Sequence, residues 1–277
     1  MTSLSLVFSP CPNDTFIFDA FVNDKIKKTF HLTYRMLDIE KLNKSAISRK
    51  FDIIKISVPL YSKIYKEYQL LTAGSALGEN NGPLLVAGNQ FDLSELKKKL
   101  VAIPGKNTTA NFLLDLFYPN LKRKRSILFS EIINHIKNGS VSAGLLIHET
   151  RFTYKSQRLI CLADFGKMWK KKTGKMLPLG VIAVRRNLSD ELKKEINRKI
   201  SESIKFAQKN PTLSKDFIQK HAAEMDVKVQ RKHINLYVNN YSVNMGEKGK
   251  RAVEMLLKLY SERQKINCPD FKGMWVG

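Results

Sequence analysis

The chain has 277 residues, of which 43% are hydrophobic, and its 48 lysines and arginines outnumber 25 aspartates and glutamates. This length and apolar content suffice for a sizeable core and exclude a disordered chain. The net charge of +23 suits anionic partners in general, and the basic residues are spread along predicted amphipathic helices. No recognised motif and no interleaved aromatic residues accompany the two dense basic blocks, so we expect no specific nucleic-acid partner.

The cysteines and the first residues bear on the cellular compartment. Cys11, Cys161 and Cys268 are too few and too irregularly spaced for a zinc site or a disulfide framework, and we expect no metal. An odd number of cysteines fits a reducing compartment. The first residues lack a basic start and reach Pro10 and Pro12 too early for a signal peptide, and no apolar run reaches the length of a membrane span. These features predict a cytoplasmic protein with no membrane span.

Strands alternate with helices over the first two thirds of the chain. Apolar or alternating runs predict strands at residues 4–8, 30–36, 51–57, 70–73, 84–87, 100–103, 126–129, 143–147, 160–163 and 177–184. Residues 189–263 predict helices alone, with breaks at Asn210-Pro211 and Met245-Gly246. This order of elements predicts an α/β protein with a helical C-terminal part.

The loop after the first strand is a candidate ligand site. Pro10 and Pro12 end the strand, and we expect Asn13 or Asp14 to cap a helix that starts at Thr15. A strand, a polar loop and a helix N-terminus together suit an anion or a polar ligand. A plain strand-to-helix turn explains the prolines and the cap almost as well, so the loop alone does not decide the function.

Two further segments place polar residues near strand ends. Lys55 lies within a buried type of strand that ends at Ser57, and lysine is rarely buried without a partner. The loop at residues 104–110 carries glycine, lysine and threonines before a helix, but it lacks the spacing of a nucleotide-binding P-loop. Small hydroxyl residues such as Thr108 and Thr109 at a helix N-terminus suit a carboxylate.

His148 follows the apolar run at residues 143–147, which reads as a buried strand. In α/β sheets ligands bind at the carboxyl ends of strands, where this pattern puts the histidine. An ordinary pKa near 6.5 lets an imidazole accept or give a proton at neutral pH. A hydrogen-bonded structural histidine would produce the same pattern, and periodicity alone does not separate the two interpretations.

Several motifs together resemble one enzyme family. They read SPCPNDTF at residues 9–16, PGKNTTA at 104–110, IHETRFT at 147–153, DFGKMW at 164–169, PLG at 178–180 and YVNNYS at 237–242. Their order and identity resemble the 1,4-dihydroxy-6-naphthoate synthases of the futalosine route to menaquinone. The resemblance spans nearly the whole chain. One departure is Asn244-Met245-Gly246, where the family pattern leads us to expect Asp-Leu-Gly.

The resemblance implies a fold of the periplasmic-binding-protein type II class. Such a fold has two α/β lobes joined by two crossing segments, with the ligand between them. We expect the crossings near Gly88 and near Leu177. The first lobe would then combine residues 1–88 with residues 178–277, and the second would hold residues 89–177.

The resemblance also implies an activity, that of a carbon–carbon lyase without metal or organic cofactor. Its small anionic substrate would be cyclic dehypoxanthine futalosine and its product 1,4-dihydroxy-6-naphthoate. His148 would act as the proton acceptor, and Lys55 would supply one fixed positive charge. Substrate would be held by the segments that contain Asn13, Lys55, Ile56, Ser57, Thr108, Thr109 and Ala110.

Two other functions share this fold. A solute-binding protein would have the same cleft without chemistry, and the absence of an export signal argues against it. The sister enzyme, chorismate dehydratase, would share the fold and the pathway, but we do not expect it to carry the SPCPNDT motif at residues 9–15.

Overall fold

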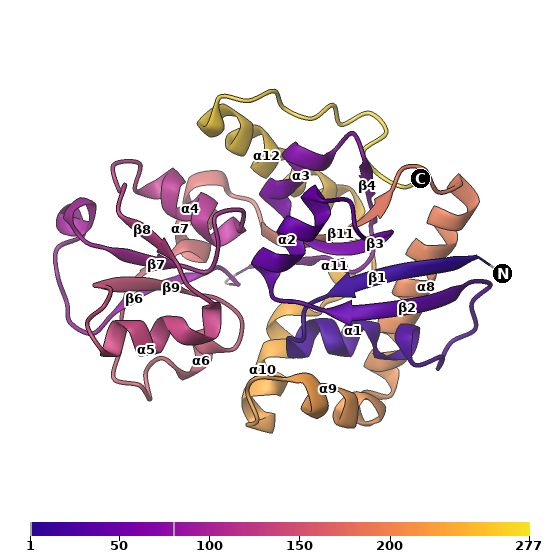
Figure 1. The fold of residues 1–277 in the computed structure, drawn as a ribbon, viewed down its shortest axis with the longest axis horizontal. Helices are drawn as coiled ribbons and strands as arrows, with labels where there is room; N and C mark the ends of the chain where they lie inside the picture. Colours follow the sequence, from indigo (N-terminus) through magenta and orange to yellow (C-terminus); the bar gives the residue numbers. More distant parts are fainter. Residues whose placement is uncertain (1, 80) are drawn as a thin grey trace.

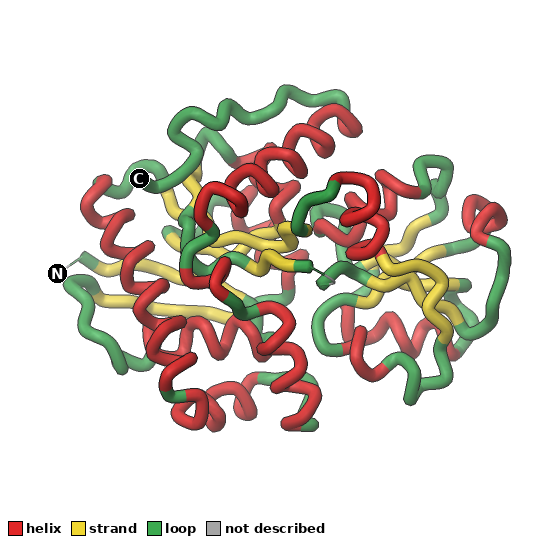
Figure 2. The backbone as a smooth tube through the Cα atoms, turned by 180° about the vertical axis from the view of Figure 1, so that it is seen from behind, coloured by secondary structure: helices red, strands yellow, loops and turns green. Residues whose placement is uncertain are grey.

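The computed structural model describes residues 2–79 and 81–277, which form two α/β lobes lying side by side (Figure 1). Each lobe contains one mixed β-sheet with helices against its faces, and both chain termini lie on the larger lobe. Seen from behind, the strands form two separate groups, one in each lobe (Figure 2). The two-lobed α/β architecture expected from the sequence is therefore present.

The larger sheet has the strand order β2-β1-β3-β11-β4, and β5 pairs with β11. Strand β1 is parallel to β2 and β3, whereas β11 is antiparallel to β3, β4 and β5. The strands are β1 (Ser3–Phe8), β2 (His31–Met36), β3 (Ile53–Ser57), β4 (Tyr68–Leu70), β5 (Ala76–Gly78) and β11 (Leu177–Arg185).

The smaller sheet has the strand order β10-β6-β9-β7-β8. Strand β7 is parallel to β8 and β9, and β6 is antiparallel to β9 and β10. The strands are β6 (Leu84–Ala87), β7 (Val101–Ile103), β8 (Lys124–Ser126), β9 (Ala143–Leu146) and β10 (Ile160–Asp164).

The chain changes lobes twice, and the first change comes earlier than we expected. Strand β5 ends at Gly78 in the larger sheet, and β6 starts at Leu84 in the smaller one. The expected crossing near Gly88 assigns β6 to the wrong lobe, because a sequence pattern locates a strand without identifying its partners. The return falls between the end of α7 (Phe165–Thr173) and the start of β11 at Leu177.

Helices cover both faces of the larger sheet. Helices α1 and α8 pack against each other on one face, while α2, α3 and α12 pack on the other. The helices of this lobe are α1 (Pro12–Val22), α2 (Ile39–Ile47), α3 (Tyr61–Ile64), α8 (Asp190–Lys209), α9 (Lys215–His221), α10 (Val227–Tyr237), α11 (Asn240–Val243) and α12 (Gly246–Gln264). The helices of the smaller lobe are α4 (Thr109–Phe117), α5 (Ile132–Lys137), α6 (Thr150–Thr153) and α7 (Phe165–Thr173). Short 3-10 helices are found in both lobes: η1 (Val58–Leu60) and η4 (Pro211–Ser214) in the larger one, and η2 (Leu93–Lys98) and η3 (Phe129–Glu131) in the smaller one.

Helix α1 begins three residues before the start that the sequence suggested. Pro12 occupies its first turn and Cys11 is the N-cap residue, without a side-chain hydrogen bond to the helix. Proline fits the first position because its fixed φ is helical and because the N–H at that position has no partner within the helix. Asn13 and Asp14 therefore lie inside the first turn and are free to make other contacts.

The parallel strands of both sheets direct their carboxyl ends to the same space. In the larger sheet Ser9 follows β1 and Ser57 ends β3, while in the smaller sheet Thr108 lies in the loop after β7 and His148 lies just beyond β9. All four residues line one pocket between the lobes. The fold thus brings together segments that are far apart in the sequence.

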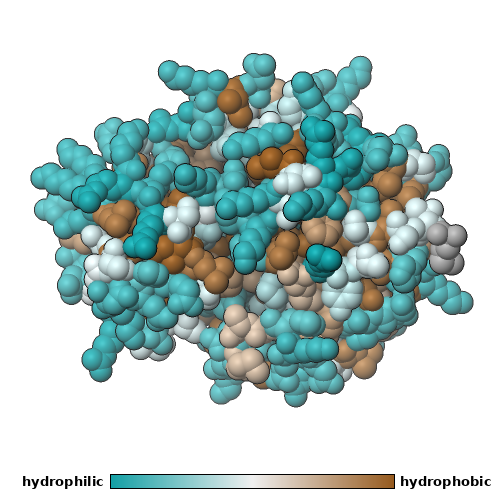
Figure 3. Space-filling model, in the orientation of Figure 1, coloured by the Kyte–Doolittle hydropathy of each residue, from teal (hydrophilic) through white to brown (hydrophobic). Residues whose placement is uncertain are grey.

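One face of the molecule is mainly hydrophilic. Hydrophilic side chains cover most of the face shown in Figure 3, and hydrophobic residues there form small separate areas. No helix in the described part of the chain is long and apolar enough to span a membrane.

Candidate active site

The pocket between the lobes contains nearly all of the residues that the sequence singled out. Asn13, Lys55, Ser57, Thr108, Thr109, Ala110 and His148 line it, together with Ser9, Asp14, Ile39, Ala76, Asn81, Pro83, Ile147, Leu179, Gly180 and Tyr237. Ile56 does not belong to this lining. The pleat of β3 turns its side chain into the core against α2, α3 and α12, so only its backbone can serve a ligand.

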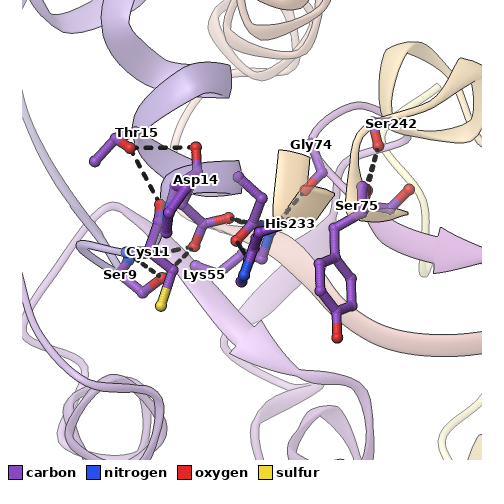
Figure 4. Close-up of polar contacts among 12 residues, drawn as sticks. Ser9, Cys11, Asp14, Thr15, Lys55, Gly74, Ser75, His233 and Ser242 are labelled. Atoms are coloured by element: carbon purple, nitrogen blue, oxygen red, sulfur yellow. Dashed lines mark hydrogen bonds and ion pairs between the residues drawn. The ribbon is translucent and has the colours of Figure 1, made fainter. Parts of the chain in front are cut away.

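Lys55 forms a buried ion pair with Asp14. Its Nζ lies 2.9 Å from Asp14 Oδ1 and donates a second hydrogen bond, of 3.0 Å, to the carbonyl of Gly74. Asp14 also accepts a hydrogen bond from the Ser9 hydroxyl at 2.8 Å (Figure 4). It accepts another from the Asn13 amide at 2.8 Å. The fixed positive charge expected of Lys55 is therefore present and is balanced by the carboxylate of Asp14 on α1.

Ser57 is held in place by a side chain of α2. The amide of Asn43 accepts a hydrogen bond from the Ser57 backbone N–H at 3.0 Å and donates one to the Ser57 hydroxyl at 3.1 Å. The Ser57 hydroxyl oxygen therefore accepts a hydrogen bond from Asn43, and the hydroxyl proton stays available to donate to a ligand.

The start of α4 forms the opposite wall. Thr108 is the N-cap residue, and its hydroxyl accepts a hydrogen bond from the backbone N–H of Asn111. The helix has nine residues, and the backbone N–H groups of its first turn favour an anion at this position. Thr109 Oγ1 donates a 2.7 Å hydrogen bond to the carbonyl of Leu179 in the other lobe.

Further hydrogen bonds hold the lobes together at the same loop. The backbone N–H and the side-chain amide of Asn107 both donate to Glu40, at 3.1 and 3.0 Å, and the Asn107 carbonyl accepts from Asn43 at 3.2 Å. Lys63 donates to the Asn107 side chain at 2.9 Å. Because α2 and α3 belong to the larger lobe, these contacts describe a closed arrangement of the cleft.

His148 adopts a backbone conformation that few residues favour. Its φ is +54°, in the left-handed region, and such strain is often found at functional sites. Phe129 packs edge-on against the imidazole at 4.9 Å between ring centres. Nε2 is shielded from solvent and has no hydrogen-bond partner among the described residues.

The environment keeps His148 neutral at physiological pH. Burial lowers the pKa of His148 from 6.5 to about 4, and Lys55 adds to this lowering, while Asp14 opposes it. A neutral imidazole has a lone pair that can accept a proton. The same carboxylate of Asp14 would stabilise the imidazolium that such a transfer creates.

Sequence reasoning did not identify Glu149 and His233, which lie beside His148. The His233 ring is fully buried and stacks at 12° to that of His148, with 6.1 Å between ring centres. His233 Nε2 lies 2.8 Å from Asn13 Oδ1, and its Nδ1 lies 3.6 Å from Glu149 Oε2. The helical pattern of residues 227–237 gives no sign of this role, since a buried histidine there looks like any other core position.

One group of residues in the described chain has donor atoms close enough to suggest a metal ion. Donor atoms of Cys11, His148 and Glu149 lie within 4.8 Å of one another. Burial raises the pKa of Cys11 well above 9.0, so the sulfur is a thiol rather than the thiolate that binds metals. In addition, Oε2 of Glu149 faces Nδ1 of His233. We assign no metal ligands here, and metal independence stays a prediction.

A model of a protein family described as "Menaquinone biosynthesis" matches residues 4–262. The chain belongs to this menaquinone biosynthesis family. It is 38% identical over 276 residues to a 1,4-dihydroxy-6-naphthoate synthase from Thermus thermophilus, with 100% of both chains covered. It is 35% identical over 260 residues to one from Streptomyces coelicolor, with 92% of each covered. The family that the motifs resemble is thus confirmed, and the chain is an enzyme of menaquinone biosynthesis.

Solved structures agree with the expected fold of this family member. A protein from Archaeoglobus fulgidus superposes with a TM-score of 0.90 at 32% identity, covering 95% of this chain and 98% of that chain. A ligand-binding component of an ABC-type import system from Staphylococcus aureus gives 0.73 at 11% identity, covering 99% and 96%. An alkanesulfonate-binding protein from Xanthomonas axonopodis gives 0.72 at 9% identity, covering 98% and 95%. These last two likenesses concern the fold alone and confirm its periplasmic-binding-protein class.

Proposed function

We propose that the protein converts cyclic dehypoxanthine futalosine into 1,4-dihydroxy-6-naphthoate and is a carbon–carbon lyase. The family and its two relatives that bear the product's name support this assignment. The observation that carries it is the neutral imidazole of His148 on the wall of a closed pocket whose other walls present hydroxyl and backbone N–H groups. A base and anion-stabilising groups that line one pocket are what the reaction requires.

His148 is proposed as the general base. The reaction fragments a hydroxylated ring next to a carbonyl group. His148 takes the hydroxyl proton, the oxygen forms a carbonyl as the adjacent carbon–carbon bond breaks, and the electron pair of that bond moves onto the neighbouring carbonyl as an enolate. The negative charge of Asp14 raises the pKa of His148 and so stabilises its protonated form during the step.

The start of α4 and Ser57 are proposed to hold the substrate. Backbone N–H groups of Thr109 and Ala110 lie in the first turn of α4, where the helix favours a carboxylate or an enolate oxygen. The Ser57 hydroxyl can donate to a substrate oxygen from the other lobe. Lys55 lines the pocket and is paired with Asp14, so we propose that the pair orients polar groups without adding net charge.

The two lobes are proposed to move as units about the segments that join them. The expected division, corrected to the observed sheets, places residues 2–78 and 177–277 in one unit and residues 84–173 in the other. Substrate would enter when the cleft opens, and the hydrogen bonds between Asn107 and Glu40 would form again on closing.

The test is to incubate the pure protein with the proposed substrate under defined conditions. We expect cyclic dehypoxanthine futalosine to be consumed and 1,4-dihydroxy-6-naphthoate to form, as followed by mass spectrometry, with no added cofactor and with EDTA present. His148→Asn serves as the control for contaminating activity. Binding of this compound without any product would contradict the proposal and favour a solute-binding protein. Loss of turnover in EDTA that one divalent ion restores would contradict metal independence.

A further inference from the structure

Glu149 and His233 place two buried atoms opposite each other, each without another partner. Oε2 of Glu149 lies 3.6 Å from Nδ1 of His233. Both atoms are shielded from solvent, and neither has a hydrogen-bond partner among the residues that the structure describes. Glu149 follows His148 in the smaller lobe, whereas His233 belongs to α10 of the larger lobe. The contact therefore spans the cleft beside the proposed base.

The hydrogen bonds of Asn13 determine which nitrogen of His233 carries a proton. The Asn13 side-chain nitrogen donates to Asp14 Oδ1, so its oxygen is the atom that faces His233 Nε2 at 2.8 Å. An amide oxygen only accepts, and Nε2 must therefore donate. In a neutral ring Nδ1 then has a lone pair directed at Glu149. If Glu149 is ionised, two acceptors face each other; one proton on Glu149 replaces this conflict with a hydrogen bond.

The electrostatics argue against an extra proton on His233. Burial, followed by the charges of His148 and Arg151, lowers the pKa of His233 well below 6.5. Burial raises the pKa of Glu149 from 4.5 to about 7, although a hydrogen bond from its own backbone opposes the change and Glu224 adds to it. Both directions assign the proton to the carboxyl group and exclude an ordinary ion pair.

The elements packed around Glu149 supply the groups that decide its charge. Cys11 at the start of α1 is a thiol, whose pKa is raised by burial. Glu224, between α9 and α10, repels a second negative charge. Arg151 on α6 contributes to the lowered pKa of His233, and it partly offsets the rise that burial causes in the pKa of Tyr237. Burial is thus the largest influence on the pKa of Glu149 itself.

We propose that Glu149 is protonated in the closed site and donates to Nδ1 of His233, which makes Glu149 a positioning residue for His148. Glu149 is the next residue after His148, and His233 stacks against the His148 ring. The hydrogen bond therefore fixes both the backbone that follows the base and the ring packed on its face. His148 has an unfavourable φ of +54°, so its orientation depends on such contacts.

The same hydrogen bond couples closure of the cleft to pH. When the lobes separate, water reaches Glu149 and its pKa returns toward the ordinary value, so opening releases a proton. The closed pKa of about 7 lies above the open one near 4.5, so the stabilisation of the closed state is fully present below about pH 4.5 and is lost as the pH rises to about 7. Between these two values each pH unit reduces the equilibrium constant for closure by about tenfold. Within the closed state, the hydrogen bond to His233 is lost as the pH rises above about 7, when Glu149 gives up its proton.

A direct titration tests the protonation without reference to activity. In metal-free protein labelled with ¹³C at the glutamate carboxyl carbons, the Glu149 signal is identified by its absence in Glu149→Gln. We expect this signal to titrate near pH 7, while the signal of exposed Glu95, identified in Glu95→Gln, serves as the matched control. Titration of Glu149 in the ordinary range of a carboxyl group, or a shift seen only when zinc is added, would overturn the proposal.

Kinetics of the variants test the positioning role, which rests on the proposed function. Glutamine donates a hydrogen bond to Nδ1 at every pH, so Glu149→Gln should retain at least about tenfold more turnover than Glu149→Ala and should lose the decline above pH 7. Equal losses in the two variants, or an unchanged decline in Glu149→Gln, would overturn it. If the wild type converts no substrate, the proposed function fails, and the titration still decides whether Glu149 carries the proton.

Discussion

Thr109 and Leu179 are joined across the cleft by a 2.7 Å hydrogen bond from the threonine hydroxyl to the leucine carbonyl. Thr109 is the first residue of α4 in the smaller lobe, and Leu179 lies in β11 of the larger lobe. The hydroxyl that the resemblance assigns to substrate binding thus already donates to the protein. Its oxygen can still accept a hydrogen bond, and the backbone N–H of Thr109 is a separate donor.

Thr109→Val removes this bond while keeping the shape of the side chain. A net hydrogen bond contributes about 0.5–1.5 kcal/mol, so the closed state should weaken by that amount and KM should rise by about 2- to 10-fold. Small-angle scattering should show a less compact particle in solution. Thr173→Val is the matched control, because the Thr173 hydroxyl donates within α7, to Trp169. Equal effects in both variants would refute a role for Thr109 in closure.

His148→Asn keeps a similar size and removes the titratable ring. General base catalysis contributes about 10²–10⁴-fold, and single-turnover rates should fall by at least this range while substrate binding persists. Thermal unfolding of the same preparation separates catalysis from structure. If the histidine is only structural, its replacement should instead lower stability and leave the folded fraction active. Near-normal single-turnover rates would therefore remove His148 from the mechanism.

His148 should also make the protein less stable in acid. Its folded pKa of about 4 lies below the unfolded value of 6.5, so the stability it contributes is present above pH 6.5 and lost as the pH falls toward 4. The loss amounts to about 2–3 kcal/mol at pH 4.5. Urea unfolding at pH 7.5 and 4.5 should therefore show a smaller difference in His148→Asn than in the wild type. The same difference in both proteins would contradict the lowered pKa.

Replacing only one partner of the ion pair between Lys55 and Asp14 should cost far more stability than replacing both. Lys55→Met or Asp14→Asn alone leaves a buried charge uncompensated, and each should destabilise by about 3–5 kcal/mol. The double variant should be more stable than the sum of the two losses implies. Lys170→Met is the control, since its partner Glu79 and Lys170 itself are about half exposed, and this change should cost less than about 1 kcal/mol. Chemical unfolding of all four variants measures these losses. If the losses of Lys55→Met and Asp14→Asn add in the double variant, the two side chains do not form a buried pair.

The positive charge should act as a general property of the surface. We expect nucleic-acid binding to be weak, independent of sequence and steeply reduced by salt, because basic residues without base-reading groups contact only phosphates. Fluorescence anisotropy with unrelated DNA and RNA oligonucleotides at several salt concentrations measures this. Submicromolar binding of one particular sequence at physiological salt would show that a dedicated interface exists.

The sequence predicts the parts of the fold that depend on local pattern. Residues 84–87 form the strand expected there, and His148 lies just past the end of its strand. It does not predict β5 at Ala76–Gly78, because this short strand forms only by pairing with β11. Ile56 could have been excluded from the pocket by strand alternation, since neighbouring residues of a strand face opposite sides.

The rest of the site depends on contacts between distant segments. Asp14 and Lys55 are 41 residues apart, and Asn13 and His233 are 220 residues apart. Nothing local in the sequence shows that these side chains meet. The loop at residues 9–16 was identified as a ligand site, but its contact with α10 required the packing of the whole lobe.

The position of β11 between β3 and β4 has a consequence for how the chain folds during synthesis. Strands β3 and β4 are made early, yet neither can complete its hydrogen bonds until Leu177 and the residues after it leave the ribosome. The smaller lobe is continuous in sequence and can fold first, at a time when the edges of the larger sheet are still open. Unpaired edges of this kind promote aggregation. During synthesis the first 78 residues should therefore need protection, for example by a chaperone, until β11 has been made and pairs with β3 and β4.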